Sequence, residues 1–282
     1  MNLMSDPRVK RFSLTDLRSA RESGAKIPVL TAYDYCSAKL MSQAGVRVLL
    51  VGDSAANVIL GHETTLPVSL DFMAELTGAV RRGAADAFVI ADLPFGSYGA
   101  SDEQGALSAF RMVQLSGCDC VKIETGAASI PLVARLADAG VAVMAHIGLR
   151  PQSVARLGGY KAQGRTAPEA DEIVVLAQKL ELAGAVALLV EAVPDEVGAA
   201  VVNATRVPVI GCGAGPACCG YVVVTQDLLG ISGHSPRFVP DYGPGVKQAL
   251  LQAFGRWAQD VTTGHYPTAA NAYAMAEPKK TK

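Results

Sequence analysis

Short apolar runs alternate along the chain with longer stretches whose apolar residues recur at helical spacing. The short runs are rich in β-branched residues and predict eight strands, at residues 28–31, 46–51, 88–91, 120–123, 141–145, 187–190, 207–211 and 221–225. The longer stretches predict helices between them, at residues 35–44, 70–82, 102–116, 129–139, 168–183, 194–203 and 227–229. The alternation therefore indicates repeated strand–helix units.

Continuous apolar runs such as 48–51 and 188–190 are typical of strands buried on both faces, which favours a parallel sheet. Eight strand–helix units in 282 residues predict an α/β fold, a closed (β/α)8 TIM barrel that forms one domain over residues 1–282. The main alternative is an open doubly wound sheet. Outside the repeat we expect an N-terminal helix at 9–24 on the barrel floor, a C-terminal helix at 245–263 and a disordered tail at 277–282.

The composition supports one large buried core, since 50% of the residues are hydrophobic and 18% are charged. A formal net charge of -1 gives no basic excess, so nucleic acid and membrane surfaces are poor candidates for partners. No apolar run approaches the roughly 20 residues of a membrane span, and residues 1–11 lack a secretory signal, so we expect a cytoplasmic protein. The six cysteines lack the paired spacing of a zinc site and are interpreted as buried free thiols.

Ionisable residues stand at or near the ends of five consecutive predicted strands. Because a TIM barrel builds its active site at the carboxyl ends of its strands, we expect these residues to share one rim. A glycine-rich stretch, residues 157–165, is expected to form a flexible loop over that rim. The rim residues are Asp53, Asp92, Lys122 with Glu124, His146 and Glu191.

Asp53 and Asp92 follow neighbouring strands and would repel each other at close range unless a cation lay between them. A hard divalent ion such as Mg2+ meets that need, because it takes oxygen ligands and keeps waters and substrate oxygens around it. The alternative is that each aspartate caps the helix after its strand.

The other candidates also have two interpretations each. Lys122 and Glu124 face the same side of a strand, where Lys122 could hold a substrate carboxylate while Glu124 contacts the metal directly or through water. The alternative is a buried ion pair between them. His146 could act as an acid or only pack in the core. Glu191 follows an apolar run that would raise its pKa toward that of a general base, unless it pairs with a loop Arg or Lys.

Seven motifs occur in order, namely Leu-Thr-Ala-Tyr-Asp-Tyr at 30–35, Val-Gly-Asp-Ser at 51–54, Ala-Asp-Leu-Pro-Phe at 91–95, Val-Lys-Ile-Glu at 121–124, Ala-His-Ile-Gly-Leu at 145–149, Gly-Gly-Tyr-Lys at 158–161 and Ile-Gly-Cys-Gly-Ala-Gly-Pro at 210–216. Together they resemble the ketopantoate hydroxymethyltransferase family. The resemblance implies a TIM barrel of the phosphoenolpyruvate-mutase-like superfamily that requires Mg2+ or another divalent ion. It also implies 5,10-methylenetetrahydrofolate as co-substrate and conversion of 3-methyl-2-oxobutanoate to ketopantoate, in pantothenate and coenzyme A biosynthesis.

The resemblance also implies roles for individual residues. Asp53 and Asp92 would be metal ligands, and Glu124 would lie on or near the metal. Asp53, Ser54, Asp92 and Lys122 would contact the 2-oxo acid. The family further implies a large homo-oligomer, often a decamer, with the C-terminal helix at a subunit contact.

Glu191 resembles the proposed general base of the family, which removes the C3 proton of the 2-oxo acid. The resulting enolate, stabilised by Mg2+, would attack the folate-derived carbon, and His146 or a water would protonate the product. The rival interpretations are a lyase or mutase of the same superfamily and a barrel that binds a 2-oxo acid without turnover. Lyases of that kind usually carry a reactive cysteine on a mobile loop, and residues 152–165 contain none.

Overall fold

Eight parallel strands form a closed barrel in the computed structural model, which describes residues 10–233, 235–240 and 242–275. Each strand pairs with the next along the chain, and the last pairs with the first. This topology confirms the TIM barrel and excludes the open sheet. The strands are β1 (Ile27–Thr31), β2 (Val48–Val51), β3 (Phe88–Asp92), β4 (Cys120–Glu124), β5 (Val143–Gly148), β6 (Ala187–Glu191), β7 (Val209–Cys212) and β8 (Gly220–Val223).

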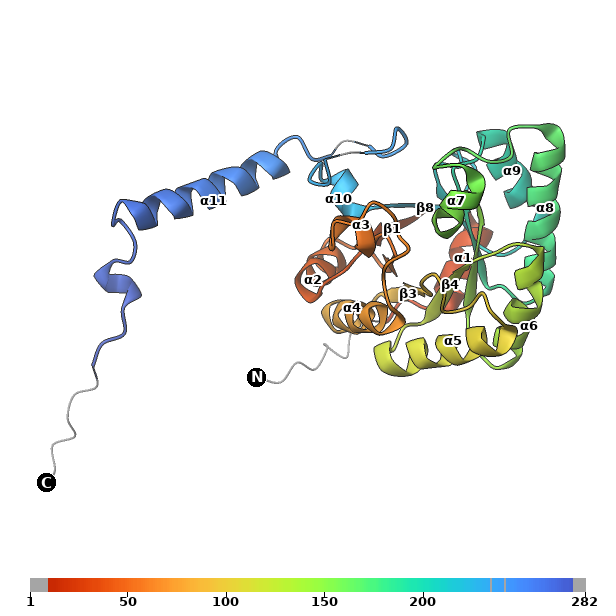
Figure 1. The fold of residues 1–282 in the computed structure, drawn as a ribbon, viewed down its shortest axis with the longest axis horizontal. Coiled ribbons are helices and arrows are strands. Elements are labelled where there is room, and N and C mark those ends of the chain that lie inside the picture. The colour runs from red at the N-terminus through yellow and green to blue at the C-terminus, as the bar shows by residue number, and fades with distance from the viewer. Residues whose placement is uncertain (1–9, 234, 241, 276–282) are drawn as a thin grey trace, which may run out of the picture. The chain divides into compact units, whose positions relative to one another are not determined.

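Long helices follow the strands and cover the outside of the barrel (Figure 1). Helix α5 (Asp102–Ser116) begins where a serine predicts a helix start, because the Ser101 hydroxyl accepts a hydrogen bond from the Gln104 N–H at 3.1 Å. These helices are α2 (Tyr35–Gln43), α4 (Leu70–Gly83), α5 (Asp102–Ser116), α6 (Ile130–Asp138), α8 (Ala167–Leu182) and α9 (Asp195–Ala204).

Short helices complete the connections, and most of them were not predicted. A single turn shows no periodicity in the sequence, so only the one near residue 227 was anticipated. They are α3 (Ala55–Val58), α7 (Val154–Leu157), α10 (Thr225–Leu228) and the 3-10 helices η1 (Ala127–Ser129), η2 (Pro151–Ser153) and η3 (Ala269–Asn271).

Three strands begin two residues later than predicted because the first residues use their N–H groups elsewhere. The N–H groups of Val46 and Val141 donate to carbonyl groups five residues earlier, at 3.0 and 2.9 Å, so both residues still belong to the preceding helix end. The N–H of Val207 donates to Glu181 Oε1 at 3.0 Å. An N–H satisfied in this way cannot also join the sheet.

The amino-terminal end of the barrel interior is closed by apolar side chains. Leu17 of α1 (Leu14–Ser23) is 1% exposed and packs in one cluster with Ile27, Val48 and Phe88 from the strands. Helix α1 therefore covers the barrel floor, where the sequence analysis expected a helix. A separate apolar layer lies between the strands and the surrounding helices.

None of the six cysteines, all of which the structure describes, forms a disulfide. Four are buried as predicted, but Cys36 is exposed because it lies in the first turn of α2. Cys212 is partly exposed at the end of β7.

The carboxyl-terminal part of the chain forms a second compact unit. The first unit contains residues 1–225 and 236–239, and the second contains residues 226–235 and 240–282. Helix α11 (Val246–Thr262) belongs to the second unit and is within one residue of its predicted bounds. The expected tail at 277–282 lies outside the described residues. Within the described part of the chain, no helix has the length and apolarity that crossing a membrane requires.

Candidate active site

The alternation of side chains along the strands directs the ionisable candidates into the barrel. Residues that point inward are two positions apart, so an apolar residue near the strand start is followed by a charged or polar one near its end. The apolar members belong to the cluster that also contains Leu17. The pairs are Ile90 with Asp92, Cys120 with Lys122 and Glu124, Met144 with His146, and Leu189 with Glu191.

Asp53 and Asp92 lie together, and neither acts as a helix cap. The N–H of Asp53 donates to Asp92 Oδ2 at 2.9 Å. Both residues are buried, with Asp53 5% and Asp92 2% exposed. Ser54 precedes α3 and makes no capping hydrogen bond, while α5 is capped by Ser101. Ser54 reaches the same rim, since its hydroxyl lies 2.7 Å from the Tyr33 hydroxyl. The capping interpretation of both aspartates is therefore excluded.

Lys122 pairs with Asp92 across the sheet, not with Glu124. Its Nζ lies 3.1 Å from Asp92 Oδ1 and 3.3 Å from His146 Nδ1. Burial alone would lower the pKa of Lys122, but the nearby carboxylates of Asp92, Asp53 and Glu124 raise it above its ordinary value. Lys122 therefore carries a fixed positive charge inside the rim.

His146 lies between Lys122 and Glu191. It lies inside β5 because the strand continues to Gly148, so the prediction that His146 ends the strand was wrong. Burial, and then the charge of Lys122, lower the pKa of His146 well below its ordinary value, so the ring is neutral near pH 7. An ammonium group can only donate, so Nδ1 accepts from Lys122 and the proton belongs on Nε2, which faces Glu191 Oε2 at 3.3 Å.

Glu191 is the most accessible carboxylate of the cluster, with its side chain 20% exposed. Burial raises its pKa to about 7, and Lys122 lowers it in part. Among the described residues no Arg or Lys forms a salt bridge with Glu191, so the alternative of a loop ion pair is not realised. Glu191 can therefore exist in both protonation states near neutral pH.

Gln152 ties together two carboxylates that belong to separate segments, a role that was not predicted from the sequence. Its amide Nε2 donates to Asp53 Oδ2 at 2.7 Å, and its backbone N–H donates to Glu124 Oε1 at 2.9 Å. The Tyr98 hydroxyl donates to Gln152 Oε1 at 2.7 Å and accepts from the Glu124 N–H at 3.0 Å. Gln152 appeared only beside a motif after β5, and its partner Asp53 is 99 residues away in sequence.

The cluster carries more negative than positive groups. Burial is the largest cause that raises the pKa of Asp92 to about 7 and of Glu124 to about 8, and it raises the pKa of Asp53 as well. Asp92 Oδ1 and Glu124 Oε2 are buried without a hydrogen-bond partner, although Lys122 lies near the first. Such oxygens suit a hard cation.

The three carboxylates proposed as metal ligands are not assembled into a ready three-ligand site. Within the described residues, no three His, Cys, Asp or Glu side chains are grouped so that they could hold a metal ion. The adjacency of Asp53 and Asp92 is compatible with two direct ligands, because Mg2+ usually keeps several waters and substrate oxygens. Binding of the metal, and the part of Glu124 in it, stay predictions.

The glycine-rich loop predicted at 157–165 lies beside the rim. The N–H of Gln163 donates to the Ala192 carbonyl at 2.9 Å, directly after Glu191. Ala192 has a φ of 46°, which is rare for a residue with a side chain. Burial, and then the charges of Asp53 and Glu191, raise the pKa of Tyr160 in this loop.

Four carboxylates, one lysine and one neutral histidine thus meet at the carboxyl ends of the barrel strands. This fold and this site define the class of the protein, a TIM-barrel enzyme whose rim is equipped for acid–base chemistry.

Comparisons with known proteins identify the family. The family model described as ketopantoate hydroxymethyltransferase matches residues 11–269. The 3-methyl-2-oxobutanoate hydroxymethyltransferase of Thermobifida fusca is 44% identical over 265 residues, covering 94% of both chains, and that of Geobacillus kaustophilus is 43% identical over 264 residues, covering 93% of this chain and 94% of the relative. The chain belongs to the ketopantoate hydroxymethyltransferase family and is a transferase.

A solved structure supports the fold. A 2,3-dimethylmalate lyase, described as a phosphoenolpyruvate mutase/isocitrate lyase superfamily member, has a TM-score of 0.56 at 18% identity, covering 87% of this chain and 98% of that chain. At this identity the likeness concerns the barrel alone.

Proposed function

We propose that this enzyme transfers a hydroxymethyl group from 5,10-methylenetetrahydrofolate to 3-methyl-2-oxobutanoate and so forms ketopantoate (2-dehydropantoate) for pantothenate and coenzyme A biosynthesis. The names of the relatives support the acceptor. The structural observation that supports the chemistry is the position of Glu191. It is a partly exposed carboxylate with a pKa near neutrality, next to a rim that can bind an anionic substrate.

The site residues fit Mg2+, or another hard divalent ion, as the metal. Asp53 and Asp92 would hold it, with Glu124 as a direct or water-mediated ligand. The buried Glu124 Oε2, which has no hydrogen-bond partner, supports this assignment. Bound there, the ion would polarise the ketone of the 2-oxo acid and make its C3 proton more acidic.

Lys122 and Ser54 would bind the 2-oxo acid together with the two aspartates. Lys122 is buried and keeps its charge, so it can hold a substrate carboxylate at a fixed place in the barrel. The Ser54 hydroxyl is oriented by Tyr33 at 2.7 Å and can donate to the same substrate. Both interactions would fix the C3 carbon in front of Glu191.

Glu191 would remove the C3 proton. Water would release the one-carbon unit from the folate as formaldehyde, by breaking both C–N bonds and leaving tetrahydrofolate. The carbon nucleophile would then attack the formaldehyde carbon, whose oxygen becomes the hydroxyl of the product. A pKa of about 7 leaves Glu191 largely ionised slightly above neutral pH, while it stays basic enough to accept a proton from carbon. His146 contributes by position. Its lowered pKa argues against an imidazolium acid, and its Nε2 lies 3.3 Å from Glu191 Oε2, although no hydrogen bond joins the two atoms in the structure. Protonation of the product then falls to water.

The proposed function is tested with the purified protein, Mg2+, 5,10-methylenetetrahydrofolate and 3-methyl-2-oxobutanoate, by following ketopantoate with mass spectrometry. Product that depends on all three components supports the proposal. Cleavage of a C–C or C–P bond in superfamily substrates, without ketopantoate, would favour the lyase or mutase alternative. Calorimetric binding of the 2-oxo acid without any turnover would favour a silent barrel.

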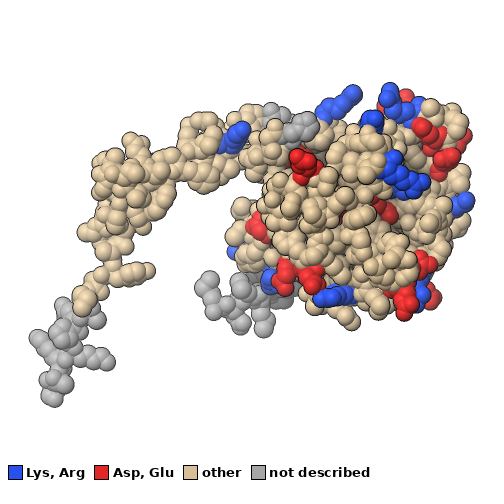
Figure 2. All heavy atoms as spheres, viewed as in Figure 1, with Lys and Arg blue, Asp and Glu red and all other residues tan. Residues whose placement is uncertain are grey.

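The enzyme would act in the cytoplasm as a homo-oligomer, expected to be a decamer, in which α11 contacts another copy. The apolar side chains of α11 are exposed in the structure, and Figure 2 shows few charged side chains on the visible surface of this helix. Replacing Phe254 with Glu should reduce the mass measured by light scattering. An unchanged mass would exclude α11 from the contact. The exposed apolar residues are Leu250, Leu251, Phe254, Trp257 and Val261.

A further inference from the structure

A cleft of about 840 Å³ opens beside the active-site cluster. Glu124 and Gln152 form part of its wall, and Gln152 also donates to Asp53, so the cleft borders the carboxylate cluster. The remaining wall comes from the loop after β3, the segment around η1, and η2 with α7. The volume falls within the roughly 300–1,000 Å³ of typical small-molecule sites.

The wall of this cleft combines an exposed aromatic ring with two arginines. Phe95 is 56% exposed and lines the cleft, so its ring is accessible to a ligand there. Arg150 donates to the Thr125 carbonyl at 3.2 Å, and Arg156 is exposed. Neither arginine forms an ion pair with a carboxylate among the described residues. The cleft thus offers an apolar face and two arginines without an ion-pair partner, while its one carboxylate, Glu124, is buried.

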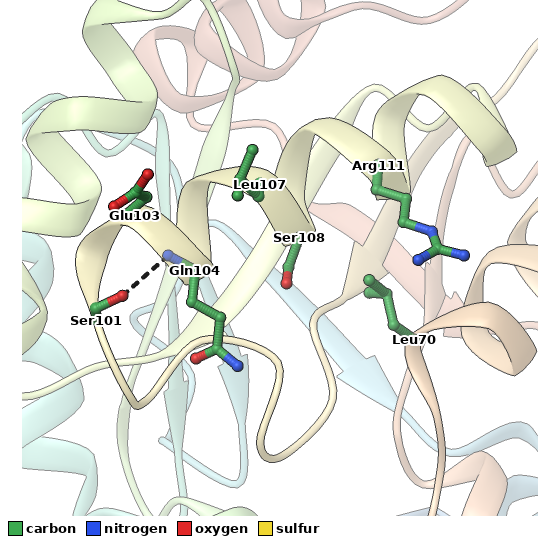
Figure 3. Close-up of a pocket in the computed structure, with 7 residues that line it drawn as sticks. All are labelled: Leu70, Ser101, Glu103, Gln104, Leu107, Ser108 and Arg111. Atoms are coloured by element: carbon green, nitrogen blue, oxygen red, sulfur yellow. Dashed lines mark hydrogen bonds between the residues drawn. The ribbon is translucent and has the colours of Figure 1, made fainter.

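A second hollow lacks these properties and serves as a comparison. It measures about 400 Å³ and lies beside α5 (Figure 3). Its arginine, Arg111, already pairs with Asp71 at 2.8 Å, and Glu103 adds a negative charge to the wall. No residue of the catalytic cluster lines it. An anionic ligand would therefore find no free cation there.

We infer that the larger cleft binds the part of the folate co-substrate that lies beyond the transferred carbon. This inference rests on the proposed function, which requires a second substrate to reach the C3 carbon in front of Glu191. Folate combines flat rings with glutamate carboxylates, so a ring packs against Phe95 and the carboxylates meet Arg150 and Arg156. A guanidinium binds a carboxylate through paired hydrogen bonds, which makes arginine suited to this end of the ligand.

The test measures binding directly, by calorimetry on the full chain with Mg2+, using 5-formyltetrahydrofolate as a stable probe. Arg156→Ala should raise its dissociation constant about tenfold or more, since a hydrogen bond to a charged group is lost. The affinity for 3-methyl-2-oxobutanoate should not change. Arg111→Ala, in the second hollow, is the matched control and should leave both affinities unchanged.

Two further probes assign the contacts. p-Aminobenzoylglutamate should lose affinity in Arg156→Ala, whereas p-aminobenzoate, which lacks the glutamate, should bind both proteins alike. Phe95→Ala should weaken both ring-containing probes by about fivefold, through lost aromatic contact. Circular dichroism checks that each variant is folded.

The outcomes separate this inference from the proposed function. If the wild type makes ketopantoate but Arg156→Ala and Phe95→Ala bind the probes normally, the cleft is excluded while the function stands. If the wild type makes no ketopantoate, the function fails. In that case the binding measurements alone test whether the cleft holds folate. Absence of probe binding to the wild type then overturns the inference.

Discussion

The two ends of the barrel interior are built from the same strands but carry opposite kinds of side chain. At the floor, Leu17 packs against the apolar residues that begin the inward face of the strands. At the rim, two or four residues further along, Asp92, Lys122 and Glu124 occupy the same face. Burial of apolar side chains stabilises the fold at the floor, whereas burial of charged groups at the rim is unfavourable for stability.

This difference shows how the floor assists the chemistry at the rim. Apolar packing below the carboxylates keeps water out, and desolvation is the largest cause of the raised pKa values of Asp92, Glu124 and Glu191. Substitutions at the rim should therefore change turnover and leave the fold intact. Substitutions at the floor should lower the stability of the fold and leave turnover nearly unchanged.

The largest effect on turnover is expected from Asp92→Asn. It removes a proposed metal ligand and the ion-pair partner of Lys122 while conserving volume, so Mg2+-dependent turnover should fall by about 10³-fold or more. Steady-state kinetics and circular dichroism measure the two properties separately. Asp71→Asn, on the surface, is the control and should retain wild-type turnover. Normal turnover of Asp92→Asn would remove Asp92 from the metal site.

Glu191→Gln is expected to have the next largest effect. Turnover should fall by about 10²–10⁴-fold, because the substitution removes the general base without changing the shape of the site. The specific measurement is exchange of the C3 proton of 3-methyl-2-oxobutanoate into deuterated water, recorded by NMR without folate. Wild-type exchange in this variant would show that another group is the base.

Gln152→Leu should lower kcat/KM by about 10–100-fold. The substitution removes the hydrogen bond that the Gln152 amide donates to the Asp53 carboxylate at Oδ2. The concentration of Mg2+ needed for half-maximal activity should rise as well. A purely structural role would lower the melting temperature and leave this Mg2+ dependence unchanged.

The pH dependence of turnover should reflect Glu191. A base must be ionised, and the pKa of Glu191 in the free enzyme is about 7, so kcat/KM should fall about tenfold for each unit below pH 7 and level off above it. Stopped assays from pH 5.5 to 8.5 measure this profile. The acidic limb should disappear from the residual activity of Glu191→Gln, and its persistence would assign the limb to another group.

Leu17→Ala should have the smallest effect on turnover and a clear one on stability. Removing this buried side chain leaves a cavity at the floor, which should lower the free energy of unfolding by about 2–4 kcal/mol. Urea unfolding measures the loss, and kcat at 25 °C should stay within about twofold of the wild type. A large fall in kcat would show that the two ends are coupled.

The sequence by itself determined the eight strands, the closed barrel and the residues gathered at its rim. This was possible because apolar periodicity is local, and because a parallel barrel directs the carboxyl ends of all its strands to one side. The step of two along each strand then fixes which residues point inward, as for Lys122 and Glu124.

The tertiary structure alone decided which of these residues meet. Lys122 pairs with Asp92 on the neighbouring strand and not with Glu124, since the register between strands is set by the whole barrel. Gln152 reaches Asp53 across 99 residues, and no local pattern reports such a contact. The pKa values belong to this level too, because desolvation depends on every side chain packed around a group, wherever it lies in the sequence.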